Sequence, residues 1–359
     1  VAQYTGADET AEAEYAASQT VTFALLFSAT LGLAGFFVVG DFLSLIGASG
    51  PVLPPATDYM EVVTLGLPFM FGFIVFIALM RGSGDTITPM LVMLGTVILN
   101  VALDPFLIFG WGPFPELGVQ GAAIATVFSR GLAMAVGVAI MIGGRRGIQI
   151  NVRDMVPDLT YARRLLRIGV PASVEGTSRA VSVNLLLVIV ATFSVTVEAA
   201  FGVGVRVFST IFMPAIAVDR GVETMTGQNI GAGKPDRAAT ANHFAAKASF
   251  VILAALGVVT FAVAPAVMSI FSDDPAVISE GANFLRIVAP TFGCIGVVRA
   301  YSGGFRGAGK VLTAAGISIL MLGLIRLPIA WFGAQIYGPN GIWASFAISN
   351  VLAATIAYL

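Results

Sequence analysis

The chain has 359 residues, of which 57% are hydrophobic and only 11% charged, and its mean hydropathy is +0.92. Soluble domains carry roughly one quarter charged residues, so this composition indicates a protein that spans the membrane many times. A single cysteine and a single histidine exclude a disulfide framework and a thiolate or imidazole metal cluster. The net charge of −1 gives no sign of a nucleic-acid partner, and we expect no cofactor.

Stretches of about 20 apolar residues are long enough to cross the hydrocarbon core as helices. In chain order they are residues 19–40, 61–80, 88–109 and 121–142, followed by residues 166–193, 200–222, 244–268, 281–301, 312–332 and 341–359. The sequence thus predicts an all-α polytopic membrane protein with about ten helices.

Positive charges then orient these helices. Arg81, Arg306, Lys310 and a group of arginines between residues 145 and 167 fall in what we take to be alternate loops, which the positive-inside rule places in the cytoplasm. The first loop, which is acidic, is an exception. The pattern predicts a multi-pass protein with both termini in the cytoplasm.

An internal repeat is the most informative feature of the chain. Gln3–Asp8 (QYTGAD) resembles Gln228–Gly233 (QNIGAG), Arg81–Gly84 (RGSG) resembles Arg306–Gly309 (RGAG), and both copies lie 225 positions further on. Such a duplication in a membrane protein places the working cavity between two pseudo-symmetric bundles and favours alternating access. Two helices precede the second copy but none precedes the first, so we infer an N-terminally truncated chain that would have about twelve helices when complete.

The repeat divides the chain into three parts. We predict an N-terminal bundle over residues 1–143, a cytoplasmic linker over 144–160 and a C-terminal bundle of six helices over 161–359. Pro157-Asp158-Leu159-Thr160 is typical of the start of a helix, because Pro and Asp favour the first turn.

Several motifs in this order resemble the multidrug and toxic compound extrusion (MATE) family, in particular its prokaryotic members, the archaeal type included. They are Gly6–Asp8 with its copy Gly227–Gly233, Arg81–Thr86, Leu103–Pro105 and Gly118–Thr126. The resemblance implies a monomeric transporter of the cell membrane, not an enzyme, that exchanges H⁺ or Na⁺ for organic cations.

Ionisable groups at membrane depth are costly and therefore functional candidates. Asn100 and Asp104 are four residues apart, hence on one helix face and about 6 Å from each other. Thr126, on the next helix, should lie at a similar depth of roughly 9 Å. Their oxygens suit a proton or Na⁺, although the alternative is that Asp104-Pro105 caps a helix distortion. In the MATE family the matching residues form the cation site with an Asp on the first helix, which is absent here, so we expect an incomplete site.

The second half offers further charged candidates. Glu175 could serve coupling or substrate binding, or could simply be neutralised by Arg179 four residues later. Arg326 lies near the middle of a helix and must find a carboxylate or carbonyl, which suggests a structural counter-ion. Asp219 and Glu223 lie near the cytoplasmic end of their helix, where we expect a salt-bridged gate or a solvated rim.

An ATP-driven pump can be set aside, whereas three other functions remain open: a flippase, a channel and an intramembrane enzyme. Gly304–Lys310 fits a phosphate-binding loop only in part, because Val311 replaces the Ser or Thr that reaches Mg²⁺, so we interpret it as a turn rather than as part of an ATP-driven pump. A flippase for lipid-linked oligosaccharides would show a more cationic cavity. A channel would need a ring of like charges, and an intramembrane enzyme would need more than a lone His243 and Cys294.

Overall fold

The computed structural model describes residues 1–359 as helices and connecting turns that form two compact units, Val1–Leu165 (unit 1) and Leu166–Leu359 (unit 2). The boundary falls within helix α7 (Leu159–Val190). Nine helices are long and apolar enough to cross a membrane, or ten when one bent pair is counted as a span. The prediction of an all-α polytopic membrane protein is confirmed.

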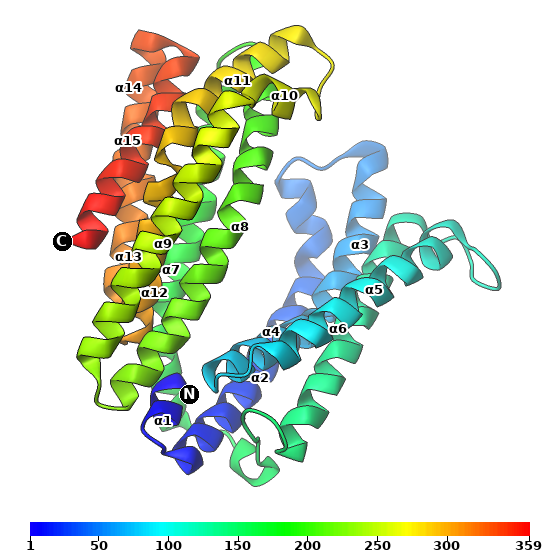
Figure 1. The fold of residues 1–359 in the computed structure, drawn as a ribbon. Helices are drawn as coiled ribbons and strands as arrows, with labels where there is room; N and C mark the ends of the chain where they lie inside the picture. Colours follow the sequence, from blue (N-terminus) through cyan, green and yellow to red (C-terminus); the bar gives the residue numbers. More distant parts are fainter. The chain divides into compact units, whose positions relative to one another are not determined.

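Unit 1 is built around α2 and α6, which can be followed in Figure 1. Helix α2 packs against α3 and α4, and α6 packs against α3, α4 and α5. Fully buried Phe73, Phe76, Met80 and Met141 form its core. The elements of this unit are α1 (Ala2–Gly6), α2 (Thr10–Leu45), η1 (Gly50–Val52), α3 (Leu53–Leu65), α4 (Leu67–Gly82), α5 (Ile87–Phe109), α6 (Gly118–Gly143), η2 (Val152–Met155) and the start of α7.

The second predicted span, residues 61–80, was wrong in its extent and shape. Helix α3 ends at Leu65, α4 begins at Leu67, and the pair is bent by 51°. The break follows from Pro68 in the first turn of α4, which has no N–H to donate into the preceding turn. Hydropathy could not locate it, because apolar residues continue across the bend.

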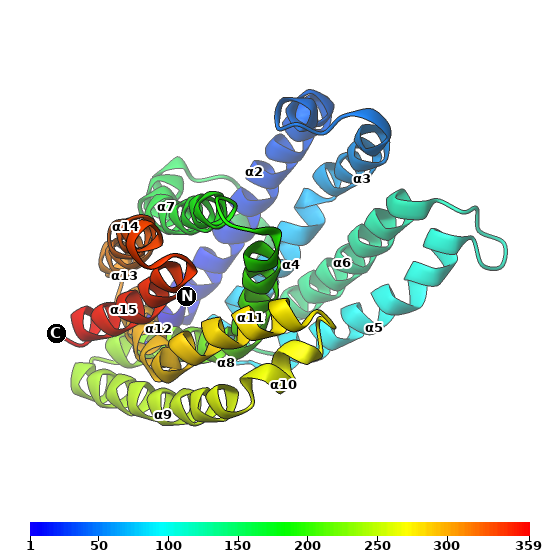
Figure 2. The ribbon, with the colours of Figure 1, turned by 90° about the horizontal axis from the view of Figure 1, so that it is seen from above.

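Unit 2 surrounds α12, which packs against α8, α9 and α15 (Figure 2). Its core is rich in aromatic rings, with Phe201 stacked on Trp343 at 5.6 Å and Phe284 edge-on to Trp343 at 4.9 Å between ring centroids. After α7 its elements are α8 (Val195–Gly231), α9 (Pro235–Ala262), α10 (Ala264–Ser269), α11 (Pro275–Val288), η3 (Ala289–Thr291), α12 (Phe292–Gly307), α13 (Val311–Ile319), η4 (Leu320–Arg326), α14 (Leu327–Tyr337) and α15 (Pro339–Tyr358).

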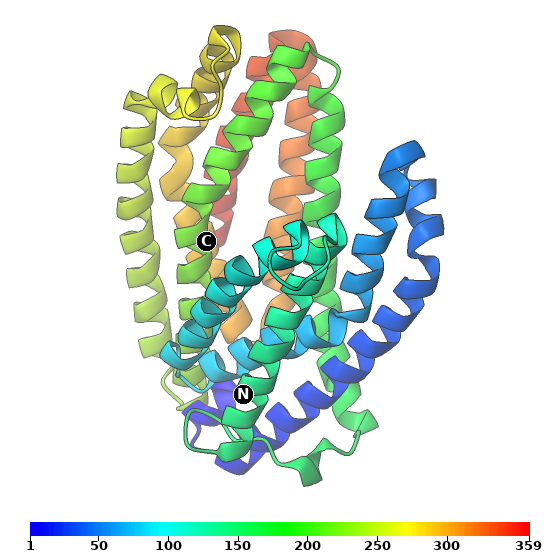
Figure 3. The same ribbon diagram turned by 90° about the vertical axis from the view of Figure 1, so that its right-hand side faces the viewer.

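The connection before α7 is held along the start of α2 (Figure 3). Gln19 is only 1% exposed, and its Nε2 donates to the carbonyl oxygens of Asp154 at 2.6 Å and Val156 at 2.7 Å. The Tyr15 hydroxyl donates to the Asp158 carboxylate over 2.9 Å and holds the pKa of that carboxyl below its usual value. As predicted, Pro157 and Asp158 stand immediately before a helix.

The sequence repeat is also present in the backbone. Asp8 has a left-handed φ of 60°, and Gly233, its counterpart 225 positions on, has a φ of 70°. Close helix approaches recur as well. A Cβ atom added to Gly32 would clash with the carbonyl oxygen of Thr64, and one added to Gly257 would clash with that of Ala289, again 225 positions on. The two units therefore share local backbone geometry at positions 225 residues apart.

Candidate functional site

The acidic candidate of unit 1 lies on α5. The side-chain amide Nδ2 of Asn100 donates to Oδ1 of Asp104 over 3.4 Å, and both residues are half-buried. Pro105 follows inside the same helix and removes one backbone donor beside the carboxylate. The two residues thus share one face of α5, in the C-terminal half of the helix.

Thr126, the third candidate of unit 1, lies on the neighbouring helix α6. The two helices approach closely where Gly121 meets the Leu107 carbonyl, because a Cβ atom at Gly121 would clash there. The Thr126 side chain is half-buried, but no hydrogen bond joins its hydroxyl to Asn100 or Asp104. The structure therefore brings two of the three residues together. In the whole chain, no three His, Cys, Asp or Glu side chains are grouped to hold a metal ion.

Arg130 is a charged residue of unit 1 that the sequence analysis missed. It lies one turn after Thr126 in the middle of α6, half-buried, with its guanidinium carbon 5.2 Å from the centroid of the Phe73 ring. The signal was present, since an arginine in the middle of an apolar span is as unusual as Asp104.

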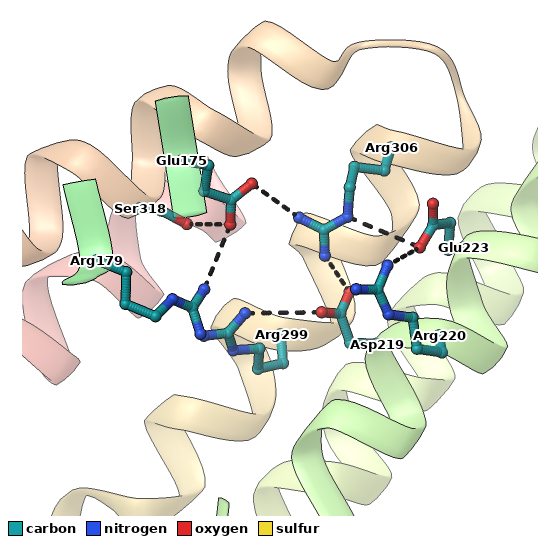
Figure 4. A network of polar contacts seen from close by, with 8 residues as sticks. All are labelled: Glu175, Arg179, Asp219, Arg220, Glu223, Arg299, Arg306 and Ser318. Carbon is teal, nitrogen blue, oxygen red and sulfur yellow. Dashed lines mark hydrogen bonds and ion pairs between the residues drawn. The ribbon is translucent and has the colours of Figure 1, made fainter. Parts of the chain in front are cut away.

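Unit 2 contains a cluster of charges that we call the charge network (Figure 4). Its first anchor is Glu175 on α7, which is 7% exposed. Glu175 accepts a hydrogen bond from Ser318 Oγ at 2.8 Å and forms ion pairs with Arg179 at 3.4 Å and Arg306 at 3.3 Å. The predicted pairing of Glu175 with Arg179 is confirmed, but Arg306 and Ser318 join it from elements far along the chain.

The second anchor is Asp219 on α8, which is 3% exposed. Arg306 donates directly to its Oδ1, and Arg299 lies 3.7 Å from its other oxygen. Helices α8 and α12 can approach this closely because Gly303 faces the backbone of Asp219. At the edge of the network, Glu223 pairs with Arg220 at 2.9 Å. The members of the charge network are Glu175, Arg179, Asp219, Arg220, Glu223, Arg299, Arg306 and Ser318.

One sequence-based placement needs correction here, and for Asp219 the structure shows salt bridges, which were one of the two expected alternatives. Arg306 is not a loop residue, because it lies in the last turn of α12 with a side chain only 10% exposed. Asp219 is not part of a solvated rim, because its carboxylate is buried between two arginines. Glu223 is one third exposed and does lie at the edge. Spacing within one helix could not reveal these pairings, since they join different helices.

Arg326 lies in the π-helical segment η4, in the middle of the span Val311–Tyr337, and is 4% exposed. Pro328 follows two residues later, and its missing N–H disturbs the α-helical hydrogen-bond ladder at this point. The guanidinium donates from Nε to Ser349 Oγ and from Nη2 to Asn350 Oδ1, both at 2.9 Å. We expected a carboxylate or a carbonyl as the partner of Arg326. The structure shows the amide carbonyl of Asn350 and no carboxylate.

A cavity of about 200 Å³ lies inside unit 2, and we call it the inner cavity. Its walls are mostly apolar and aromatic, while Arg179, Arg299 and Arg326 supply its charges. Arg179 and Arg299 also line a second hollow of about 280 Å³ that contains the carboxylates of Glu175 and Asp219. The two hollows thus share Arg179 and Arg299, and Ser318, which also lines the inner cavity, donates to the Glu175 carboxylate.

The chain resembles known proteins over nearly its whole length. The MatE family model matches residues 1–106 and 171–332. The FAD transporter of Shewanella oneidensis is 30% identical over 338 residues, which cover 94% of this chain and 74% of that protein. A Bacillus subtilis protein named "Probable multidrug resistance protein YoeA" is 27% identical over 342 residues, which cover 93% of this chain and 74% of that protein.

A solved structure has the same fold. It is described as the outward-facing conformation of a multidrug resistance MATE family transporter of the MOP superfamily, with a TM-score of 0.93 and 22% sequence identity. The match covers 99% of this chain and 80% of that chain. At this identity the likeness concerns the arrangement of helices and not the chemistry of any site.

Proposed function

The chain belongs to the MATE family of multidrug efflux transporters, and we propose that it exports organic cations in exchange for H⁺ or Na⁺ by alternating access. Family membership makes it a membrane transporter and not an enzyme. The substrate class and the coupling ion are the parts that we add, and they depend on the residues of unit 1.

The Asn100–Asp104 pair carries the proposal. A carboxylate on an apolar helix, half-buried and held by a weak 3.4 Å hydrogen bond, has no arginine or lysine paired with it. Negative charge in such a place is costly unless a cation neutralises it. Thr126 on the adjoining helix would complete the set of oxygen ligands if its hydroxyl turned toward the pair.

Competition for this carboxylate would drive the exchange. One carboxylate in a poorly solvated place is neutralised by one cation at a time, so H⁺ or Na⁺ bound at Asp104 would disfavour an organic cation there. A gradient of the small ion would then expel the drug. We further propose a monomer in the cell membrane with both termini in the cytoplasm, supported by the arginines between residues 145 and 167.

The test is drug efflux in vesicles that contain the protein at its full natural length. Ethidium export should be driven by a pH gradient, a Na⁺ gradient or both, and Asp104→Asn should reduce it to the rate measured without a gradient. Asp58→Asn, which removes an exposed carboxylate from the same unit, serves as the matched control and should leave export unchanged. Gradient-driven ethidium export by Asp104→Asn at the normal rate would contradict the proposal.

Organic anions are a second candidate class. Arginines outnumber carboxylates inside unit 2, and one relative is named as an FAD transporter. A cationic cavity is also what we expected of a lipid-linked oligosaccharide flippase. Export of fluorescein from the same vesicles, compared with export of ethidium, separates anion from cation transport.

A further inference from the structure

The inner cavity of unit 2 is lined by residues from five separate parts of the fold. Helices α7, α8, α12 and α15 contribute to it, together with the segment from α13 to η4. Its volume of about 200 Å³ is below the 300–1,000 Å³ that is typical of sites for drug-sized ligands. This volume favours a small ligand.

Arg326 is the charge most deeply buried against this cavity. It is 4% exposed and lies at mid-span, where an unneutralised charge is most costly. Its hydrogen-bond partners, Ser349 and Asn350, are both neutral, and the Asn350 amide is itself oriented by donation to Thr291 Oγ1 at 3.0 Å. These two bonds fix the guanidinium in place. An arginine has five N–H donors, so the remaining ones can bind another partner.

The carboxylates of the charge network are already paired with arginines other than Arg326. Glu175 faces Arg179 and Arg306, Asp219 faces Arg299 and again Arg306, and Glu223 pairs with Arg220. The charge network together with Arg326 contains five arginines and three carboxylates. Because arginine stays protonated in proteins, this interior carries an excess of positive charge.

Aromatic rings line the cavity next to these charges. The guanidinium carbon of Arg326 lies 4.3 Å from the centroid of Phe346, and that of Arg299 lies 4.5 Å from the centroid of Phe212. Phe201 and Phe208 also line the inner cavity. Rings in these positions would contact a flat apolar body, whereas the fork of N–H groups matches a carboxylate.

We propose that the inner cavity binds a small aromatic carboxylate, with its anionic group on Arg326 and its ring among the phenylalanines. The site lies in unit 2 and is independent of the cation exchange proposed at Asp104. A bound carboxylate supplies the negative charge that the fold itself does not provide. This would give the protein two sites of opposite polarity, one in each unit.

The experiment measures binding of two ligands with the same ring and opposite charge. Purified protein in nanodiscs is equilibrated with radiolabelled indole-3-acetate or tryptamine, and the dissociation constants are compared. We expect indole-3-acetate to bind at least about tenfold more tightly than tryptamine. Only the carboxylate of indole-3-acetate can accept a charge-assisted hydrogen bond from Arg326. Equal binding, or tighter binding of tryptamine, overturns the proposal without any variant being needed.

Variants then locate the site. Arg326→Gln keeps hydrogen-bond donors but loses the charge, and it should weaken indole-3-acetate binding about tenfold to a hundredfold. Arg326→Lys restores the charge without the fork of N–H groups, and it should therefore recover only part of the affinity. Arg286→Gln removes an exposed arginine of the same unit and should have no effect.

Two further outcomes complete the test. Undiminished anion binding by a folded Arg326→Gln variant would contradict the assignment. Should that variant not fold, Arg299→Gln, which removes another arginine of the cavity, must weaken the same ligand for the proposal to stand. Ethidium export is measured in a separate assay and depends on Asp104. Its loss or retention therefore does not change the outcome of the anion-binding experiment.

Discussion

The two units differ most in where they keep their charges. Unit 2 buries Glu175, Asp219, Arg299 and Arg326, whereas every buried polar residue of unit 1 is a neutral Ser, Thr or Gln. Asp104, the acidic candidate of unit 1, is only half-buried. The comparison teaches that a duplicated backbone can keep its turns and helix contacts while its interior electrostatics diverge.

The divergence is clearest at the helices that carry a proline within an apolar span. Asp104 precedes Pro105 on α5 in unit 1, and Arg326 lies two residues before Pro328 in unit 2. Proline loosens the backbone hydrogen bonding at both places, and a charged side chain accompanies each one. The charges have opposite signs, which is why we propose different ligands for the two units.

The largest effect is expected from removing Arg306. Arg306→Gln leaves Glu175 and Asp219 buried with fewer cationic partners, which should destabilise unit 2 by about 3–5 kcal/mol. Cys294 on α12 is the only cysteine, so a thiol-reactive dye reports the melting of unit 2 directly.

The matched control is Arg81→Gln, at the corresponding position of unit 1. Its effect should be much smaller, because unit 1 contains no buried carboxylate. The melting of unit 1 can be followed with a cysteine at the buried position Ala133, in a Cys294→Ser background. Equal losses of stability in the two units would remove the contrast between them.

An intermediate effect is expected at the connection before α7. Gln19→Leu has nearly the same shape but leaves the carbonyl oxygens of Asp154 and Val156 without their donor, at a cost of about 1–3 kcal/mol. Trypsin should then cut after the exposed Arg153 more rapidly. Gln149→Leu, which loses only a 3.4 Å hydrogen bond in the same connection, should be cut at the normal rate. Identical cleavage of both variants would argue against Gln19 as the anchor.

The smallest effect concerns the shared turn of the repeat. Asp8→Gly should stabilise unit 1 by about 0.5–1 kcal/mol, because glycine adopts the φ of 60° more readily than aspartate does. The reverse exchange, Gly233→Asp, should destabilise unit 2 by a similar amount at a φ of 70°. Both melting temperatures are read with the reporters described above. Shifts of the same sign would mean that the two turns are not energetically equivalent.

Sequence reasoning predicted the helices better than their breaks and partners. The spans from residue 88 to 109 and from 121 to 142 correspond closely to α5 and α6. The bend between α3 and α4 was missed because hydropathy is continuous through Gly66. Arg306 was misplaced because a positive charge near a glycine-rich turn looks like a loop residue.

The amino-acid sequence by itself determined the membrane environment and the approximate spans, through its apolar residues, and the duplication, through its recurring motifs, because each depends on composition or on spacing along the chain. Only the tertiary structure decided which charges are neutralised. The contact of Arg306 with Asp219 joins residues 87 positions apart on α12 and α8, and a local pattern carries no information about such a partner. The same holds for Arg326, whose lack of a carboxylate became visible only once every neighbour was in place.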